Sequence, residues 1–270
     1  MVVGTLGGPF YGEIMHHAES VLREAGIHLF VTAGNDHLEE EKQAIRFLQE
    51  RRCDALILHV NEVPNAYLAR LADEGTPLVI INRFVEPLAD TCIWLDNEKG
   101  GYLATRHLLE LGHTRIACIA GPADKSDSNE RIAGFRRALM EAEVPWNPQW
   151  LVHGHYADGG GYVPAQALMA RDDTFTAVFC ANDFIAVSAI EAFRNAGKSV
   201  PDDISVVGFD DVMFARHVIP RLTTIHFPVK EMGLRAGRLA LERMQGKGRG
   251  VVEGRLRPAL VVRESTRPPR

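Results

Sequence analysis

Residues 175–227 read FTAVFCANDFIAVSAIEAFRNAGKSVPDDISVVGFDDVMFARHVIPRLTTIHF, and this stretch decides the fold class. Within it, the apolar run 177–181 ends in Asn182-Asp183, and an amphipathic helical pattern follows. A second apolar run, 204–209, ends in Asp210-Asp211. Short buried strands that alternate with helices are typical of the parallel sheet of an α/β protein.

Asn182 and Asp210 each follow a predicted buried strand directly. In an open parallel sheet, ligands bind outside the carboxyl ends of the strands, so both side chains are expected at a binding edge. The alternative is that each residue only caps the next helix or starts a turn. One such residue alone would favour the cap, but two in the same place favour a binding site.

Strand-like and helix-like segments alternate along the whole chain. The other apolar runs that predict strands are 2–6, 28–33, 55–60, 78–82, 92–95, 115–120, 151–154 and 259–262. The amphipathic patterns that predict helices are 12–26, 38–52, 64–75, 98–111, 129–142, 159–170 and 184–197. This alternation predicts parallel sheets that helices cover on both faces, and so many strands indicate two sheets.

The composition is that of an ordinary globular protein, with 46% hydrophobic residues. Lys and Arg total 30 against 35 Asp and Glu, which gives a formal net charge of −5. A nucleic-acid-binding domain needs a basic surface to neutralise phosphates, and this chain shows none in its sequence. Any contact with DNA is therefore expected from a segment absent from these residues.

Sequence motifs for metals, nucleotides and catalysis are missing. The four cysteines are far apart and have no metal-ligand or CxxC spacing, so buried free thiols are expected. The turn at 7–12 is glycine-rich but fits neither GxGxxG nor a P-loop, and no nucleophile elbow is present. We therefore expect no cofactor, no metal and no enzymatic activity. The absence of an export signal and of a membrane-length apolar run predicts a cytoplasmic protein without membrane contact.

Several short motifs follow one another in a specific order. They are Gly8-Pro9-Phe10-Tyr11, Ile81-Asn82-Arg83, Leu95-Asp96-Asn97, Leu111-Gly112-His113, Arg131-Ile132-Ala133-Gly134-Phe135 and Val261-Val262-Arg263-Glu264-Ser265. With these motifs and the 175–227 stretch, the chain closely resembles the effector-binding domain of the lactose/galactose repressor family of bacterial transcription regulators. The resemblance covers essentially all 270 residues. Each motif alone is weak, but their order and spacing are highly specific.

The resemblance implies two Rossmann-like lobes with parallel sheets, of the type I periplasmic-binding-protein kind, joined by three crossovers. The first lobe would comprise 1–95 and 228–253, and the second 96–227 and 254–270. A helix from about Val229 to Gln245 would return to the first lobe. Gly246, Gly248 and Gly250 would form a flexible link after this helix. The family's helix-turn-helix DNA-binding head would be absent from this chain.

The resemblance also implies which residues contact the effector. They are Phe10, Tyr11, Asn82, Arg83, Asp96, Asp127, Arg131, Tyr156, Asn182 and Asp210. The physical reading agrees, because carboxylates and a guanidinium fork suit vicinal hydroxyls, and one ring from each lobe could sandwich a sugar. Arg131 is expected at the start of a helix, where the dipole disfavours a cation and a ligand or carboxylate partner explains it.

The resemblance is nearest to the galactose-responsive members, through the segments 92–97, 104–108 and 220–224. It implies a hexose effector such as galactose, and Lys125 stands where a purine-responsive member would have an arginine. A homodimer is expected, with the apolar segment 212–219 in its interface, and lobe closure would move the missing DNA-binding heads on operator DNA. The alternatives are a transport-type sugar-binding protein of the same fold and, less favoured, an enzyme on a Rossmann-like scaffold.

Overall fold

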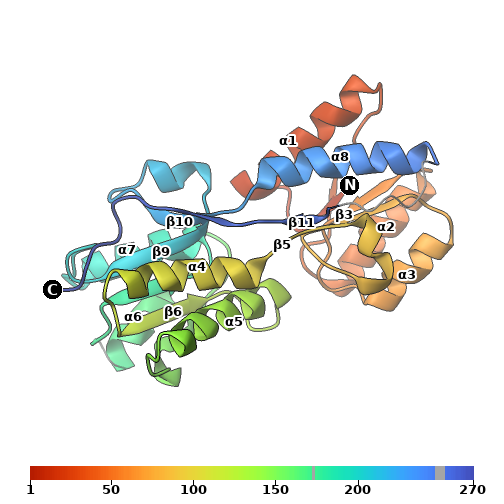
Figure 1. Cartoon of the computed structure of the whole chain (residues 1–270). Coiled ribbons are helices and arrows are strands. Elements are labelled where there is room, and N and C mark those ends of the chain that lie inside the picture. The colour runs from red at the N-terminus through yellow and green to blue at the C-terminus, as the bar shows by residue number, and fades with distance from the viewer. Residues whose placement is uncertain (172–173, 247–252) are drawn as a thin grey trace. The chain divides into compact units, whose positions relative to one another are not determined.

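The computed structural model describes residues 1–171, 174–246 and 253–270, and Figure 1 shows the course of the chain. It divides into two compact units, Met1–Leu95 with Pro228–Leu256 and Asp96–Phe227 with Arg257–Arg270. The predicted first lobe ends at residue 253. In the structure the division falls at Leu256, because the preceding residues still pair with the sheet of the first unit. Gly248 and Gly250 of the predicted link lie outside the described residues.

The first unit contains a six-stranded sheet in the order β11-β5-β4-β3-β1-β2, in which all pairings are parallel. The strands are β1 (Val2–Val3), β2 (Thr32–Ala33), β3 (Leu56–Leu58), β4 (Leu78–Ile81), β5 (Cys92–Leu95) and β11 (Arg255–Leu256). The helices are α1 (Pro9–Glu24), α2 (Leu38–Glu50), α3 (Asn65–Asp73) and α8 (Val229–Met244). Helices α1 and α8 pack against each other (Figure 1), whereas α2 and α3 bury their apolar residues in a core cluster with the sheet.

The second unit contains a six-stranded sheet in the order β12-β10-β9-β8-β6-β7. Its strands are β6 (Ile116–Ala120), β7 (Leu151–His153), β8 (Ala177–Cys180), β9 (Ser205–Asp210), β10 (Thr223–His226) and β12 (Ala259–Val261). Its helices are α4 (Asn97–Glu110), α5 (Ser126–Glu141), α6 (Tyr162–Arg171) and α7 (Asp183–Asn195). Helix α4 packs on α5, and α6 packs on α7, so this sheet also has helical cover.

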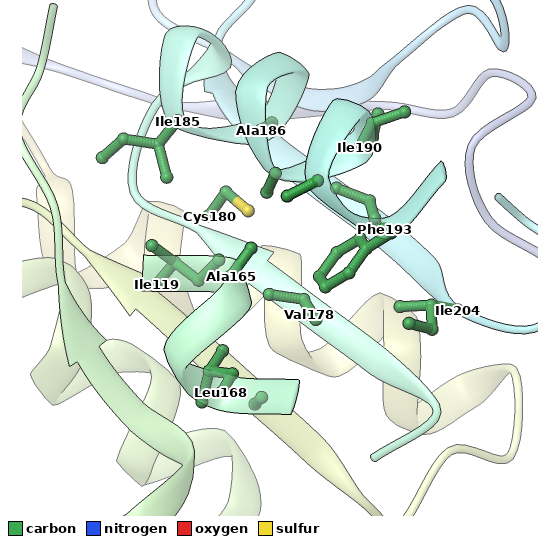
Figure 2. Packing of buried hydrophobic residues seen from close by; sticks show 14 of the residues in the cluster. Ile119, Ala165, Leu168, Val178, Cys180, Ile185, Ala186, Ile190, Phe193 and Ile204 are labelled. Carbon is green, nitrogen blue, oxygen red and sulfur yellow. The ribbon is translucent and has the colours of Figure 1, made fainter. Parts of the chain in front are cut away.

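One core cluster of the second unit lies between its sheet and the α6–α7 pair (Figure 2). Val178 and Cys180 are two positions apart on β8, so both side chains lie on the face of the sheet that packs in this cluster. Leu168 of α6 and Phe193 of α7 belong to the same cluster. All four side chains are fully buried. Burial of a leucine or phenylalanine side chain contributes roughly 1.5–3 kcal/mol, so this layer fixes α7 against the strands on either side of β8.

Two glycines allow α4 and α5 to approach each other closely. A Cβ added at Gly134 would overlap the backbone carbonyl of Glu98, and one added at Gly101 would overlap the carbonyl of Arg131. Only residues without a side chain fit at these two crossing points. The close contact places the second turn of α5 next to the first turn of α4, which matters for the site below.

The structure corrects three details of the predicted fold. Two short strands are absent from the predicted set, namely β10, whose Thr223-Thr224 are polar, and β11, which is only two residues long. Strand β12 pairs with β10 in antiparallel orientation, unlike the all-parallel expectation. The chain leaves the second unit after β10 and re-enters it with β12 without a covering helix, so the two strands run in opposite directions. Short 3-10 helices also occur at η1 (Glu86–Thr91), η2 (Pro148–Trp150) and η3 (Met213–Arg216).

Candidate functional site

The two polar residues after β9 have different environments. Asp210 and Asp211 adopt φ values of 105° and 57°, which are uncommon for residues other than glycine. Asp211 is paired within the protein, because its carboxylate accepts hydrogen bonds from Arg263 at 2.5 Å and from His226 at 3.0 Å. Asp210 instead faces Arg131, with its Oδ1 3.8 Å from Nη1. Strained backbone conformations of this kind concentrate at functional sites, and Asp210 is the candidate here.

Arg131 lies at the centre of the polar residues of the second unit. Its Nε donates to Asn97 Oδ1 at 3.0 Å, and its Nη1 donates to the Ala181 carbonyl at 2.5 Å. Asp127 and Asp210 flank the guanidinium at 3.6 and 3.8 Å. The Arg131 side chain is only 4% exposed, so its charge is balanced inside the protein.

The prediction that Arg131 begins its helix is wrong. Helix α5 begins at Ser126, three residues before the predicted start, so Arg131 lies in the second turn. The helix dipole falls off within the first turn and therefore does not explain the position of this arginine. The two flanking carboxylates are the partners that the charge requires.

Asn182 is the N-cap of α7, which was the alternative reading from the sequence. Its Oδ1 accepts a hydrogen bond from the Ile185 amide at 2.9 Å, and its Nδ2 donates to the Tyr156 carbonyl at 3.1 Å. A carboxamide has two amide hydrogens and two oxygen lone pairs, so one of each remains for a further partner. Capping and ligand contact are therefore compatible at this residue.

Tyr156 lies over Arg131, with 5.7 Å between the guanidinium carbon and the ring centroid. The ring also lies against Gly121, where an added Cβ would overlap it. Its hydroxyl is buried next to the Ser128 hydroxyl, and neither forms a hydrogen bond of normal geometry with any described residue. Burial raises the pKa of Tyr156 well above its usual value, so the phenol stays protonated.

Asp183 is a buried carboxylate that the sequence analysis did not assign to the site. Its Oδ1 accepts a hydrogen bond from Thr224 Oγ1 at 2.6 Å, and its Oδ2 accepts one from the Val212 amide at 2.9 Å. Val212 lies in the turn that carries Asp210 and Thr224 lies on the neighbouring strand β10, so Asp183 ties this turn and β10 to the start of α7. Burial, and then the charge of Asp210, raise the pKa of Asp183 well above its usual value.

Burial also raises the pKa of Asp210, to about 7, against the opposing effect of Arg131. The carboxylate therefore changes charge near neutral pH. Perturbed carboxylates of this kind are typical of functional sites, although structural ion pairs also produce them.

The predicted residues of the first unit form an aromatic group at the carboxyl ends of β1, β3 and β4. The ring centroids of Phe10 and Tyr11 are 5.3 Å apart, and those of Tyr11 and His59 are 5.1 Å apart, both in T-shaped geometry. Asn82 Nδ2 lies 3.2 Å from His59 Nε2. Asn82 has a φ of 59°, so a second predicted site residue adopts left-handed backbone. His59 was missed, because the predicted strand 55–60 included it.

Arg83 holds the loop that follows β3. It donates to the Val63 carbonyl at 2.9 Å and to Asn65 Oδ1 at 2.7 Å. Glu41, which is buried, accepts the backbone N–H groups of residues 61–63 on the same loop. Arg83 therefore fixes carbonyl groups of this loop and Glu41 fixes its amide groups. Arg83, a predicted ligand contact, thus has a structural role.

Asp96 and Asp127 both lie at helix N-termini. Asp96 is the N-cap of α4 and accepts a hydrogen bond from the Lys99 amide at 3.0 Å. Asp127, in the first turn of α5, accepts one from the Ser128 amide at 2.9 Å while its other oxygen faces Arg131. Asp96 is thus engaged in capping, whereas Asp127 belongs to the group around Arg131.

The structure brings five predicted residues of the second unit together at the carboxyl edge of its sheet. They are Asp127, Arg131, Tyr156, Asn182 and Asp210, and we call them the arginine cluster. Phe10, Tyr11 and Asn82 form a separate group in the first unit. Within the described parts of the chain, no three His, Cys, Asp or Glu side chains converge as a metal site requires. No helix in those same residues is long and apolar enough to cross a bilayer.

Comparison with known proteins decides the family. A periplasmic binding protein-like domain model matches residues 105–266. The transcriptional regulator GalR of Salmonella typhimurium (strain SL1344) is 39% identical over 89% of this chain and 70% of its own length. The chain belongs to the LacI/GalR family of transcriptional regulators.

Other family members agree. The transcriptional repressor PurR of Aliivibrio fischeri (strain ATCC 700601 / ES114) is 36% identical, over 98% of this chain and 80% of its own length. A LacI family regulator from Enterococcus faecium, solved with bound ribose, has a TM-score of 0.86 and 29% identity, covering 100% of this chain and 98% of that one. The chain is therefore the effector-binding domain of a transcriptional regulator, with the two-lobed periplasmic-binding-protein-like fold. Its relatives are regulators and not enzymes.

Proposed function

We propose that this domain binds a hexose such as galactose through the arginine cluster. The observation that carries the proposal is the placement of Arg131 between Asp127 and Asp210 at the edge of the sheet. Sugar hydroxyls both donate and accept hydrogen bonds, so paired carboxylates and the remaining groups of Asn182 match them. The ribose bound to the Enterococcus faecium regulator supports a sugar for this family member as well.

Phe10, Tyr11 and Asn82 are proposed as effector contacts from the first unit. Aromatic rings suit the apolar face of a sugar ring, and Asn82 Oδ1 is buried with no hydrogen-bond partner among the described residues. Arg83 and Asp96 are the weaker members of the predicted set, because the structure occupies them in holding a loop and capping a helix.

The effector would control DNA binding by shifting an equilibrium between two states of the regulator. It does so only through its differential affinity for the two states, typically about 1–3 kcal/mol. Contact with operator DNA would come from a segment outside these 270 residues, because this chain is acidic overall. Such a role places the protein in the cytoplasm, where the DNA is.

A homodimer is proposed, with the segment 212–219 in its interface. Met213 and Ile219 of this segment are 70% and 89% exposed, whereas Ala215 anchors it to the second unit. Exposed apolar side chains that lie close together favour a protein partner. A second copy of the chain is the partner that the regulatory function favours.

Calorimetry with a panel of hexoses, pentoses and purines tests the effector. We expect a hexose to bind with the highest affinity, and Arg131→Ala and Asp210→Ala each to lose roughly 2–5 kcal/mol of binding free energy, because a buried charge is left unpaired. Asp124→Ala is the control, since this exposed aspartate lies in the same loop outside the cluster. Normal affinity in both cluster variants would overturn the site, and a purine as the tightest ligand would overturn the sugar.

A further inference from the structure

We propose that the arginine cluster selects an uncharged sugar and rejects phosphate esters and carboxylate derivatives of the same sugar. This inference rests on the proposed function, because it concerns the same site. It concerns the charge class of the effector, which neither the fold nor the similarity to other regulators determines.

The charges of the cluster favour a neutral ligand. Arg131 is the only cation among the described residues of the cluster, and two carboxylates flank it, from Asp127 at 3.6 Å and Asp210 at 3.8 Å. Glu130, the preceding residue on α5, adds a further carboxyl group that interacts electrostatically with Asp127 and Arg131. The nearby Lys125 has its own acidic neighbour, with Nζ 4.0 Å from Asp124 Oδ2. An incoming anion therefore meets more negative than positive charge.

The guanidinium of Arg131 is also unsuited to phosphate. Arginine binds phosphate by presenting two parallel N–H groups. Here Nε donates to Asn97 and one N–H of Nη1 donates to the Ala181 carbonyl, so the parallel pair that includes Nε is already engaged. One face lies over the Phe209 ring, with the guanidinium carbon 3.8 Å from the centroid. A phosphate would have to displace interactions that the folded protein already makes.

At each helix N-terminus next to the cluster, a side chain of the protein already accepts a hydrogen bond from one backbone amide. A helix N-terminus is an anion site when its backbone N–H groups point at the ligand. In α5 the Ser128 amide donates to the Asp127 carboxylate, and in α7 the Ile185 amide donates to Asn182. Each of these N-termini therefore has one backbone amide fewer to offer to a phosphate group.

A sugar hydroxyl fits where an anion does not. It donates to Asp127 or Asp210 and accepts from a nitrogen of Arg131 or Asn182, so both halves of each contact are satisfied. A negatively charged phosphate or carboxylate group of a ligand is repelled by the carboxylates at each of these contacts. In this buried setting the repulsion is less screened by water than at an exposed surface.

Calorimetry with matched pairs tests this selection on the 270-residue chain. The pairs are galactose and its phosphate monoester, galactose and galacturonate, ribose and its phosphate monoester, and inosine and inosine monophosphate. We expect the charged member of each pair to bind at least about tenfold more weakly than the neutral one, because like charges are juxtaposed. Asp127→Asn should reduce this ratio, whereas Asp124→Asn, an identical change in charge at an exposed position just before α5, should leave it unchanged.

The outcomes separate the inference from the proposed function. A charged member that binds as tightly as its neutral partner, or more tightly, overturns the selection while leaving a sugar effector intact. If only the inosine pair binds, the sugar effector is wrong and that pair still measures the selection. If Asp127→Asn leaves the ratio unchanged, the discrimination arises outside the cluster and the inference fails. If no neutral member binds, both are wrong.

Discussion

Asp210 has a strained backbone conformation and a buried carboxylate, and Arg131 is its cationic partner in the described part of the chain. Its neighbour Asp211 has two strong partners. Burial would raise the pKa of Asp211, but its hydrogen bonds to His226 and Arg263 outweigh burial and hold the pKa below its usual value. Burying the Asp210 carboxylate therefore costs free energy that interactions within the ligand-free domain do not fully offset. A ligand that donates hydrogen bonds to the carboxylate would offset part of this free-energy cost.

The stability of the ligand-free domain should depend on pH through Asp210. The pKa of Asp210 rises from 3.8 to about 7 on folding, so the folded state binds a proton more tightly than the unfolded state. The contribution of this residue to the free energy of unfolding therefore falls as pH rises from about 4 to about 7. Thermal melts of the wild type and of Asp210→Asn from pH 5 to 8 measure it. The difference between the two isolates Asp210 from other groups whose pKa burial shifts, such as His107 and His113.

We expect Asp210→Asn to gain stability relative to the wild type as pH increases, since the amide does not ionise. Asp124→Asn is again the exposed control and should track the wild type. Melting temperatures that keep a constant difference across this range would show that Asp210 does not titrate there.

At the residue scale, the sequence predicts the members of the arginine cluster better than their partners. Asn182 and Asp210 were found because polar residues directly after buried strands are visible in the pattern. Asp183, Ser128 and His59 were missed because their importance comes from burial and from partners distant in the sequence. Asp183, for example, meets Thr224 across 41 positions of the chain.

The packed pair of helices α4 and α5 positions Asn97, which lies on α4, next to Arg131, which lies on α5. Their close contact depends on Gly101 and Gly134, where a side chain would overlap backbone carbonyls. Helix boundaries and strand ends were predicted less well than the alternation itself. Strand β10 was missed because its threonines are polar, and only the structure shows that Thr224 points to buried Asp183.

Gly134→Ala should destabilise the second unit by about 1–3 kcal/mol, because the added methyl group forces α4 and α5 apart. It should also weaken sugar binding, since the Arg131–Asn97 hydrogen bond crosses this contact. Gly12→Ala in α1 is the matched control. A Cβ there meets no atom within 4 Å, so this variant should gain roughly 0.5–1 kcal/mol from its higher helix propensity. Denaturant unfolding measures both.

Equal stability of Gly134→Ala and the wild type would show that the two helices can separate freely. Loss of stability in Gly12→Ala would show that the helix at this position is constrained by contacts outside its own unit.

On the scale of the whole molecule, the alternation of strands and helices predicted two α/β units, whereas the three places where the chain passes between them required family resemblance. Pattern alone does not locate such crossings, because they are short extended segments like any loop. The family assignment then gives the domain its regulatory role, and self-association is the property that we propose for the whole chain.

The proposed dimer predicts a particle of twice the chain mass of 29.9 kDa in light scattering. Met213→Glu should shift it toward the monomer, because a charge is placed in an apolar interface. Met140→Glu is the control, since Met140 is 71% exposed, against 70% for Met213, and lies on α5 outside the segment. A wild-type monomer, or equal effects of the two variants, would remove this interface.

The most direct test is a crystal structure of the chain with the neutral sugar that binds most tightly. We predict that the hydroxyl groups of the sugar lie within hydrogen-bond distance of the Asp210 carboxylate and of Arg131 or Asn182. A sugar bound elsewhere, with the charges of Arg131, Asp127 and Asp210 still facing only one another, would contradict the assignment of these side chains to effector binding.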